Sequence, residues 1–157
     1  MKIPFLCISL ELTCNQKWYI LLMFLEIINP WRIGMPTVLI VDDDEVNLRA
    51  VSTLVKVCMT HIHPGMVIVH AGHGADAWEK ITDPGSDVSI VISDVHMPVM
   101  TGTELANIIR EKHPDIGVIL ISGAAEPAGH SADAFLTKPL TMERMMNTIR
   151  RLMARKA

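Results

Sequence analysis

Short apolar runs alternate with amphipathic segments from Thr37 to the end of the chain. The apolar runs are rich in Val and Ile and are too short for buried helices, so they predict β-strands. The five predicted strands are residues 38–41, 66–69, 88–93, 118–122 and 134–136. Strands that alternate with helices are typical of a parallel sheet covered by helices on both faces.

The segments between these strands carry apolar residues at helical spacing. In the first helix the spacing is set by Val46, Leu48, Val51, Leu54, Val55 and Cys58. Residues 75–81, 103–112 and 142–154 predict three further helices. Between Ser122 and Phe135 the sequence contains Gly123, Pro127 and Gly129, so any fourth helix there must be short. The predicted fold class is therefore α/β, with a five-stranded parallel sheet, helices on both faces and a short fourth helix.

An N-terminal extension, residues 1–35, precedes the single predicted domain at 36–157. Its apolar run, residues 18–28, contains Glu26 and is shorter than the roughly 20 apolar residues that a membrane span needs. The extension also lacks the basic start and small-residue cleavage site of a signal peptide. It is either a helix that binds a membrane surface or a partner, or a non-native segment ahead of a true start at Met35. We favour the second interpretation and expect no firm membrane association.

Composition excludes several function classes. Half of the residues are hydrophobic, 20% are charged and the net charge is -3, which indicates a globular protein without the basic surface of a nucleic-acid binder. Cys7, Cys14 and Cys58 show no C-x-x-C spacing, so neither a disulfide framework nor a zinc site is indicated. We therefore expect a cytoplasmic protein without direct nucleic-acid binding.

Polar residues follow the predicted strands. The first strand runs into Asp42, Asp43 and Asp44, and the third runs into Asp94. Ser122 ends the fourth strand, and Lys138 follows the fifth. Ligands of open parallel sheets bind outside the carboxyl ends of the strands, so these side chains are expected to meet at one edge.

Clustered carboxylates need a hard cation or an ammonium group nearby to stay ionised together. Mg²⁺ prefers oxygen ligands and needs only one or two carboxylates when water completes its shell. An aspartate can also accept a phosphoryl group as an acyl phosphate while a metal and a lysine neutralise charge. The strand ends therefore predict phosphoryl transfer with magnesium as the cofactor.

Four segments, VLIVDDDEVN, VISDVHMPVMTG, VILISG and FLTKPLT, resemble the motif regions of response-regulator receiver domains and occur in that family's order. The resemblance covers residues 37 to about 153. Its most distinctive parts are D-x-x-M-P-x-M-x-G, from Asp94 to Gly102, and Lys138-Pro139. It implies a flavodoxin-like receiver fold and a role in two-component or phosphorelay signalling.

The resemblance also implies a role for each matching residue. Asp94 would accept the phosphoryl group, in a self-catalysed reaction, from a histidine kinase or a histidine phosphotransfer protein. Magnesium would be held by Asp42, Asp43, Asp94 and the backbone carbonyl of His96. The phosphorylated domain would then signal to an effector protein that the sequence does not identify.

Three further roles follow from the same resemblance. Ser122 and Lys138 would bind the phosphoryl group, and the orientation of Phe135 would report the state of the switch. Each has a structural alternative, because Ser122 could complete a turn, Lys138 could be a surface charge and Phe135 could be a packed residue at the sheet edge. For Asp44 we favour an N-cap of the first helix over a ligand role.

Four histidines, His61, His63, His70 and His73, lie close in sequence and could in principle bind zinc. They do not form a ligand pair on one helix, so we favour loop and strand-end positions instead. The stretch from Asp44 to Asp94 is longer than in a typical receiver, with residues 61–65 as the expected loop insertion. The region between Ser122 and Lys138 is shorter, which puts ordinary docking and dimerisation there in doubt.

The strongest alternative function is a phosphohydrolase of the haloacid-dehalogenase type, with Asp42 as the nucleophile. Asp42-x-Asp44 after a strand, a later serine and a downstream lysine also occur in that class. Such an enzyme needs a second acidic cluster late in the chain, whereas this sequence has Asp94 in mid-chain. The receiver interpretation is therefore preferred.

Overall fold

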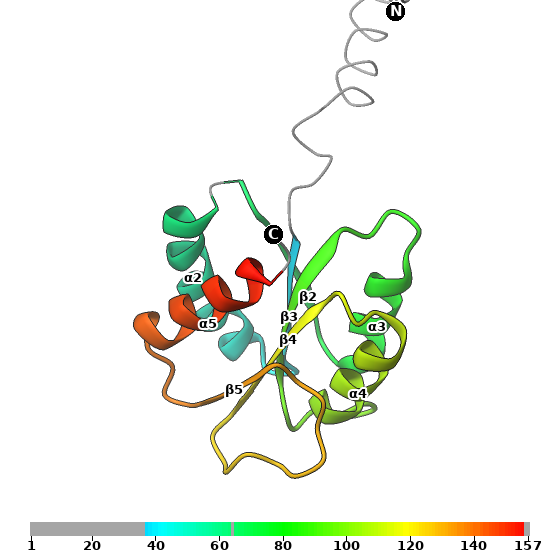
Figure 1. Cartoon of the computed structure of the whole chain (residues 1–157). Helices are drawn as coiled ribbons and strands as arrows, with labels where there is room; N and C mark the ends of the chain where they lie inside the picture. The colour runs from blue at the N-terminus through cyan, green and yellow to red at the C-terminus, as the bar shows by residue number, and fades with distance from the viewer. Residues whose placement is uncertain (1–36, 64, 156–157) are drawn as a thin grey trace, which may run out of the picture. The chain divides into compact units, whose positions relative to one another are not determined.

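The computed structural model describes residues 37–63 and 65–155, and its five strands form one parallel sheet (Figure 1). The strand order is β2-β1-β3-β4-β5. The strands are β1 (Thr37–Val41), β2 (Val67–Ala71), β3 (Val88–Asp94), β4 (Gly117–Ser122) and β5 (Ala134–Thr137). The helices in the described residues are α2 (Glu45–Ile62), α3 (Gly74–Thr82), α4 (Gly102–Lys112) and α5 (Met142–Ala154). The predicted α/β fold is confirmed.

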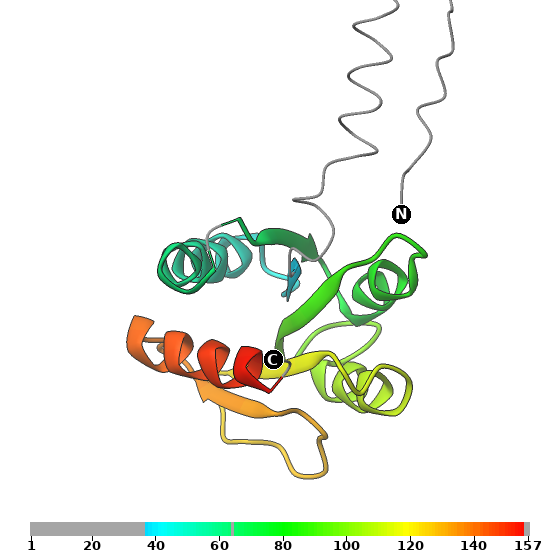
Figure 2. The same ribbon diagram turned by 45° about the horizontal axis from the view of Figure 1, so that its top comes forward.

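Helices cover both faces of the sheet: α2 and α5 lie on one side and α3 and α4 on the other (Figures 1 and 2). Side chains of β1 alternate between the two layers, with Val38 and Ile40 packed toward α2 and α5 and Leu39 and Val41 toward α3 and α4. All four are at most 1% exposed. Burying each of these side chains stabilises the fold by about 1.5–3 kcal/mol, which is why residues 38–41 are all apolar and the aspartates follow the end of the strand.

Some element boundaries differ from the sequence prediction. β2 begins at Val67 and continues to Ala71, because it pairs with the whole of β1, from Thr37–Val67 to Val41–Ala71. The expected loop insertion at residues 61–65 is partly wrong, since His61 and Ile62 complete the last turn of the 18-residue α2. The other strand and helix ends lie within one residue of their predicted positions.

One expectation falls on residues that the structure does not describe. The extension at 1–35, with its apolar run at 18–28, lies outside the described residues. Within residues 37–155, Pro64 excepted, no helix is both long and apolar enough to cross a bilayer.

The β4–β5 connection, residues 123–133, contains no helix, so even the short helix expected there does not form. Side chains of α4 hold its backbone instead. The Asn107 side chain accepts a hydrogen bond from the Ser131 N–H at 2.9 Å and donates one to the Gly129 carbonyl at 3.4 Å. Arg110 donates to the Ser131 carbonyl at 3.2 Å. These contacts satisfy backbone groups that a helix would have satisfied internally.

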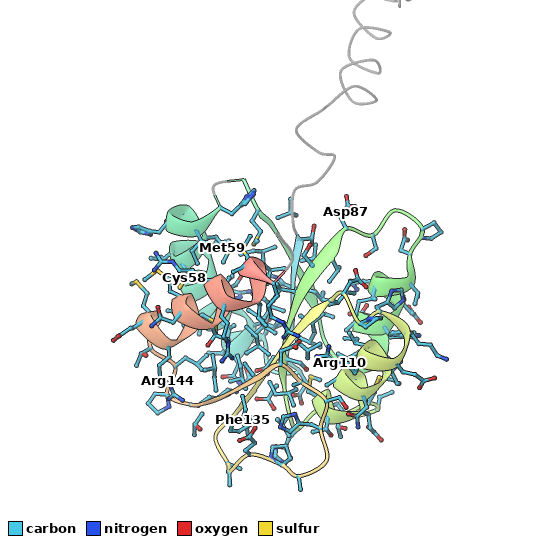
Figure 3. The ribbon with its side chains drawn as sticks, viewed as in Figure 1. Cys58, Met59, Asp87, Arg110, Phe135 and Arg144 are labelled. Carbon is cyan, nitrogen blue, oxygen red and sulfur yellow. The ribbon has the colours of Figure 1, made fainter. Side chains whose placement is uncertain are left out.

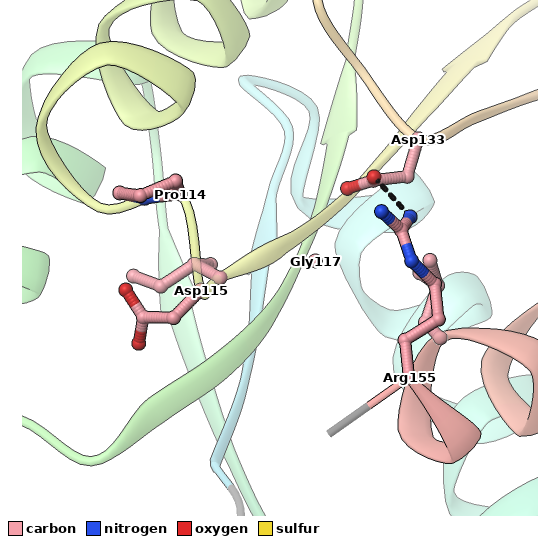
Figure 4. A pocket seen from close by; sticks show the side chains of 7 residues that line it. Pro114, Asp115, Gly117, Asp133 and Arg155 are labelled. Carbon is pink, nitrogen blue, oxygen red and sulfur yellow. Dashed lines mark hydrogen bonds and ion pairs between the residues drawn. The ribbon is translucent and has the colours of Figure 1, made fainter.

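Asp133 anchors the end of this connection. Its carboxylate accepts the Val118 N–H at 2.9 Å and pairs with Arg110 at 2.7 Å and Arg155 at 2.6 Å; Figure 4 shows the Arg155 pair beside a pocket of about 430 Å³. The side chain is only 5% exposed. Burial raises its pKa, but the Val118 N–H and the two guanidinium groups outweigh burial, so the pKa lies below its usual value. Asp133 therefore joins β4, α4 and the end of α5.

We expect Asp133→Asn to lower the free energy of unfolding by about 2–3 kcal/mol at neutral pH, because it places an amide against two guanidinium groups. The stabilisation by Asp133 is fully present above the unfolded pKa of about 3.9 and is lost as pH falls through the lower folded pKa. The difference in the free energy of unfolding between variant and wild type, measured by urea unfolding, should therefore shrink as the pH falls below these two pKa values. Glu111→Gln, which removes an exposed pair with Lys112, is the control and should change little. Equal effects of the two substitutions would contradict the anchoring role.

Candidate functional site

The carboxyl ends of β1, β3 and β5 bring together Asp42, Asp94 and Lys138, which we call the strand-end site. The Lys138 Nζ lies 2.7 Å from Asp94 Oδ1 and 3.5 Å from Asp42 Oδ2. Lys138 is 44 positions from Asp94 and 96 positions from Asp42 in the sequence, so only the parallel sheet brings the three residues together. The predicted meeting of these three side chains is confirmed.

Lys138 is held by its backbone as well as by its charge. Its N–H donates to the Ser122 carbonyl at 2.7 Å, which continues the pairing of β5 with β4. Partial burial lowers the pKa of Lys138, but the hydrogen bond and charge of Asp94, with the charge of Asp42, outweigh burial and raise it above the ordinary value. The ammonium therefore stays charged and neutralises part of the carboxylate cluster at physiological pH.

The three consecutive aspartates after β1 have different surroundings. Asp42 is 4% exposed, and its Oδ1 accepts the Asp44 N–H at 2.9 Å and the Asn47 side-chain amide at 3.3 Å. Asp43 is exposed. Asp44 caps α2, accepting the Val46 N–H at 2.7 Å, so its predicted N-cap role is confirmed.

Asp94 ends β3 at the start of a tight turn. Its Oδ2 accepts the His96 N–H at 2.8 Å, while its side chain is 13% exposed. Gly102 packs so closely against the backbone of Asp94 that a Cβ at this position would overlap the Asp94 carbonyl oxygen. The Gly102 N–H donates to the Val95 carbonyl at 3.0 Å and closes the turn. The glycine of the motif is thus required by the close approach of two backbones.

Ser122 and Phe135 adopt the structural alternatives in this state of the protein. The buried Ser122 hydroxyl accepts the Ala124 N–H at 3.0 Å and so completes a turn. Phe135, labelled in Figure 3, is half-buried. It stacks on His130, with ring centroids 6.5 Å apart. The His130 Nε2 lies 3.0 Å from a carboxylate oxygen of Glu126, which restrains the ring. The phosphoryl-binding role of Ser122 and the switch role of Phe135 stay predictions.

The donor set of the strand-end site fits a magnesium ion that keeps most of its waters. Within the described residues, no three His, Cys, Asp or Glu side chains converge as a metal site. The Lys138 ammonium lies between Asp42 and Asp94 and shows that a cation is stabilised at this position. Magnesium needs only one or two carboxylates there, and the exposed Asp43 could supply a further oxygen. The ligand role of the His96 carbonyl stays a prediction.

The four clustered histidines have separate structural environments. His61 lies in the last turn of α2 and His63 is the C-cap of that helix. His70 lies on β2, where its Nε2 is 2.8 Å from the buried Ser52 hydroxyl. His73 caps α3 by accepting the Asp76 N–H at 3.0 Å. These positions agree with the favoured interpretation except for His61, which lies in a helix rather than a loop.

Two residues near the site were missed by sequence reasoning. Asn47 donates to Asp42; it is the last residue of the VLIVDDDEVN motif region, but no role was predicted for it. His130 contacts Phe135, and no spacing rule indicates a stack across an irregular connection.

The model of the response regulator receiver domain family matches residues 38–150. The chain belongs to this family. This receiver domain is 36% identical over 127 residues to the sensor kinase CckA of Brucella abortus (strain 2308), an alignment that covers 76% of this chain and 13% of the kinase. It is 30% identical over 129 residues to the two-component response regulator ARR10 of Arabidopsis thaliana, covering 78% and 22% of the two chains.

Solved structures show the same fold. The chemotaxis response regulator CheY4 of Vibrio cholerae is 25% identical, with a TM-score of 0.60 and coverage of 76% of this receiver domain and 99% of CheY4. The chain spans only a small part of the length of the curated relatives named above. The relatives identify a receiver domain of two-component signalling, and they give no support to the phosphohydrolase alternative.

Proposed function

We propose that this receiver domain takes a phosphoryl group onto Asp94. The arrangement of Asp94 supports this most directly: one carboxylate oxygen lies 2.7 Å from Lys138, and the other accepts the His96 N–H at 2.8 Å. The carboxylate is oriented by these two contacts and is still 13% exposed. Asp42 is more deeply buried and is hydrogen-bonded from α2, so it is the poorer nucleophile of the two.

In the proposed step, a carboxylate oxygen of Asp94 attacks the phosphorus atom of a phosphohistidine. The new P–O bond replaces the P–N bond, and the donor imidazole leaves with the bonding electron pair and takes up a proton. Lys138 neutralises charge on the transferred group by a charge-assisted hydrogen bond. A magnesium ion held by Asp42, Asp43 and Asp94 would supply further positive charge when bound.

After transfer, the Ser122 hydroxyl would turn from the Ala124 N–H toward the phosphoryl oxygens. The movement would leave space for Phe135 to change its orientation and to separate from His130. The phosphorylated form would thus gain contacts that the free form lacks, which is the requirement for a shift between two states.

Family membership supports the proposed partners. The donor would be a histidine kinase or a histidine phosphotransfer protein, and the phosphorylated domain would pass the signal to an effector protein by contact. The net charge of -3 gives no basis for direct nucleic-acid binding. We place this exchange in the cytoplasm.

Mapping the modified residue tests the proposed function. The full chain is treated with phosphoramidate and Mg²⁺, reduced with borohydride to convert an acyl phosphate to homoserine, digested and analysed by mass spectrometry. We expect conversion at Asp94 alone. Conversion at Asp42 would favour a phosphohydrolase, and no conversion at all would indicate a domain that binds partners without phosphorylation.

Asp43→Ala should remove most of the Mg²⁺ binding measured by isothermal titration calorimetry, because Asp43 is the exposed carboxylate beside the buried Asp42. The matched control is Asp44→Asn, which also removes a negative charge but retains a side chain that can cap α2. Its Mg²⁺ affinity should stay close to that of the wild type. An equal loss in both variants would show that general charge, rather than Asp43 itself, attracts the metal.

A further inference from the structure

One side chain to which the receiver resemblance assigns no role contacts the strand-end site. Asn47 lies in the first turn of α2, and its amide Nδ2 is 3.3 Å from Asp42 Oδ1. The same oxygen accepts the Asp44 N–H at 2.9 Å. Both hydrogen bonds of Oδ1 therefore come from the start of α2, whereas Oδ2 is directed toward Lys138.

We infer that Asn47 is a positioning residue that orients the Asp42 carboxylate for magnesium. Two donors on Oδ1 fix the rotation of the carboxylate and leave Oδ2 on the side of Asp94 and Lys138. This inference rests on the proposed function, since it concerns the metal that phosphoryl transfer at Asp94 uses.

The distances from Lys138 to the two aspartates indicate why a second hydrogen-bond donor to Asp42 matters. Lys138 lies 2.7 Å from Asp94 but 3.5 Å from Asp42, so the ammonium binds Asp94 more closely and restrains Asp42 weakly. Without Asn47, a single backbone N–H would hold Oδ1, and the carboxylate could rotate toward Lys138. Lys138 would then move away from Asp94, and Asp42 Oδ2 would bind the ammonium group instead of a metal ion.

The chemistry of an amide suits this position. A lysine at position 47 would compete with the metal for Asp42, and an aspartate would repel Asp42 and offer it no donor. A neutral amide donates a hydrogen bond without changing the charge of the site. Hydrogen bonds to ligating carboxylates typically contribute 10–100-fold to metal affinity.

Asn47→Leu tests the inference, because leucine has a similar size and cannot donate a hydrogen bond. We expect the Mg²⁺ dissociation constant, measured by calorimetry on the full chain, to rise about tenfold. The Mg²⁺ concentration that gives half-maximal phosphorylation by phosphoramidate should rise by the same factor, while the rate at saturating Mg²⁺ stays near that of the wild type. The increase in thermal unfolding midpoint on adding Mg²⁺ should shrink accordingly.

Arg49→Leu is the matched control on the same helix, since Arg49 is exposed and pairs with Glu45. It should leave Mg²⁺ affinity unchanged. If Asn47→Leu binds Mg²⁺ as tightly as Arg49→Leu, or if only its metal-free unfolding midpoint falls, Asn47 has no positioning role. Failure of the proposed function would appear differently, as absent labelling of Asp94 in the wild type at every Mg²⁺ concentration.

Discussion

Asp94→Asn should reduce phosphoryl uptake from phosphoramidate to background. An amide is not a nucleophile at neutral pH, yet the asparagine keeps the size of the residue and an oxygen that can accept the His96 N–H. The variant should still unfold cooperatively, because the substitution removes one carboxylate from a cluster in which Asp42 and Asp94 share a single lysine. Intact-protein mass spectrometry measures the phosphoryl uptake, and urea unfolding shows whether the variant still unfolds cooperatively.

The control for this experiment is Asp115→Asn. Asp115 is exposed and directly precedes Ile116 at the amino end of β4, the opposite end of the sheet from Asp94. This variant should gain one phosphoryl group at the wild-type rate. Undiminished uptake by Asp94→Asn would show that another residue is the acceptor and would overturn the central proposal.

Gly102→Ala should be strongly destabilising. The new Cβ would overlap the Asp94 carbonyl oxygen and lie 2.9 Å from the Ser93 hydroxyl. Backbone atoms must move apart to accept it, and overpacking of this kind costs about 3 kcal/mol. Because the backbone that must move carries Asp94, the rate of phosphorylation should fall together with stability.

Gly123→Ala is the matched comparison, since no heavy atom lies within 4 Å of a Cβ at that position. Its free energy of unfolding should change by less than about 1 kcal/mol. Urea unfolding of both variants, followed by labelling with phosphoramidate, separates the close backbone approach at Gly102 from a general effect of replacing glycine. Similar stabilities for the two variants would rule out that close approach.

The sequence was sufficient to predict the sheet and the residues at its carboxyl edge. Strands that are buried on both faces need continuous apolar runs, so the first polar residue after each run marks the strand end. Asp42 and Asp94 follow from this argument, and parallel strands necessarily bring their ends together. The N-cap role of Asp44 is equally local, because the cap and the N–H groups that donate to it are within three residues of one another.

Contacts that depend on distant residues were not predictable in the same way. Asp133 meets Arg110 and Arg155 across 22 or more residues, and nothing in the local sequence distinguishes it from a surface carboxylate. The orientation of Ser122 is a rotamer choice between a turn and a ligand, and both choices fit the same sequence. The end of α2 was placed too early, because His61 and Ile62 continue the helix into the predicted loop.

The surface of the β4–β5 connection can change in sequence without losing its attachment to α4. Asn107 and Arg110 hold backbone atoms of Gly129 and Ser131, so the identity of most side chains in the connection does not affect these bonds. Ala124, Ala125 and Glu126 are exposed and can be replaced without loosening the backbone. Selection for a new binding partner can therefore alter this surface by single substitutions, while the phosphorylation chemistry at the strand ends stays unchanged.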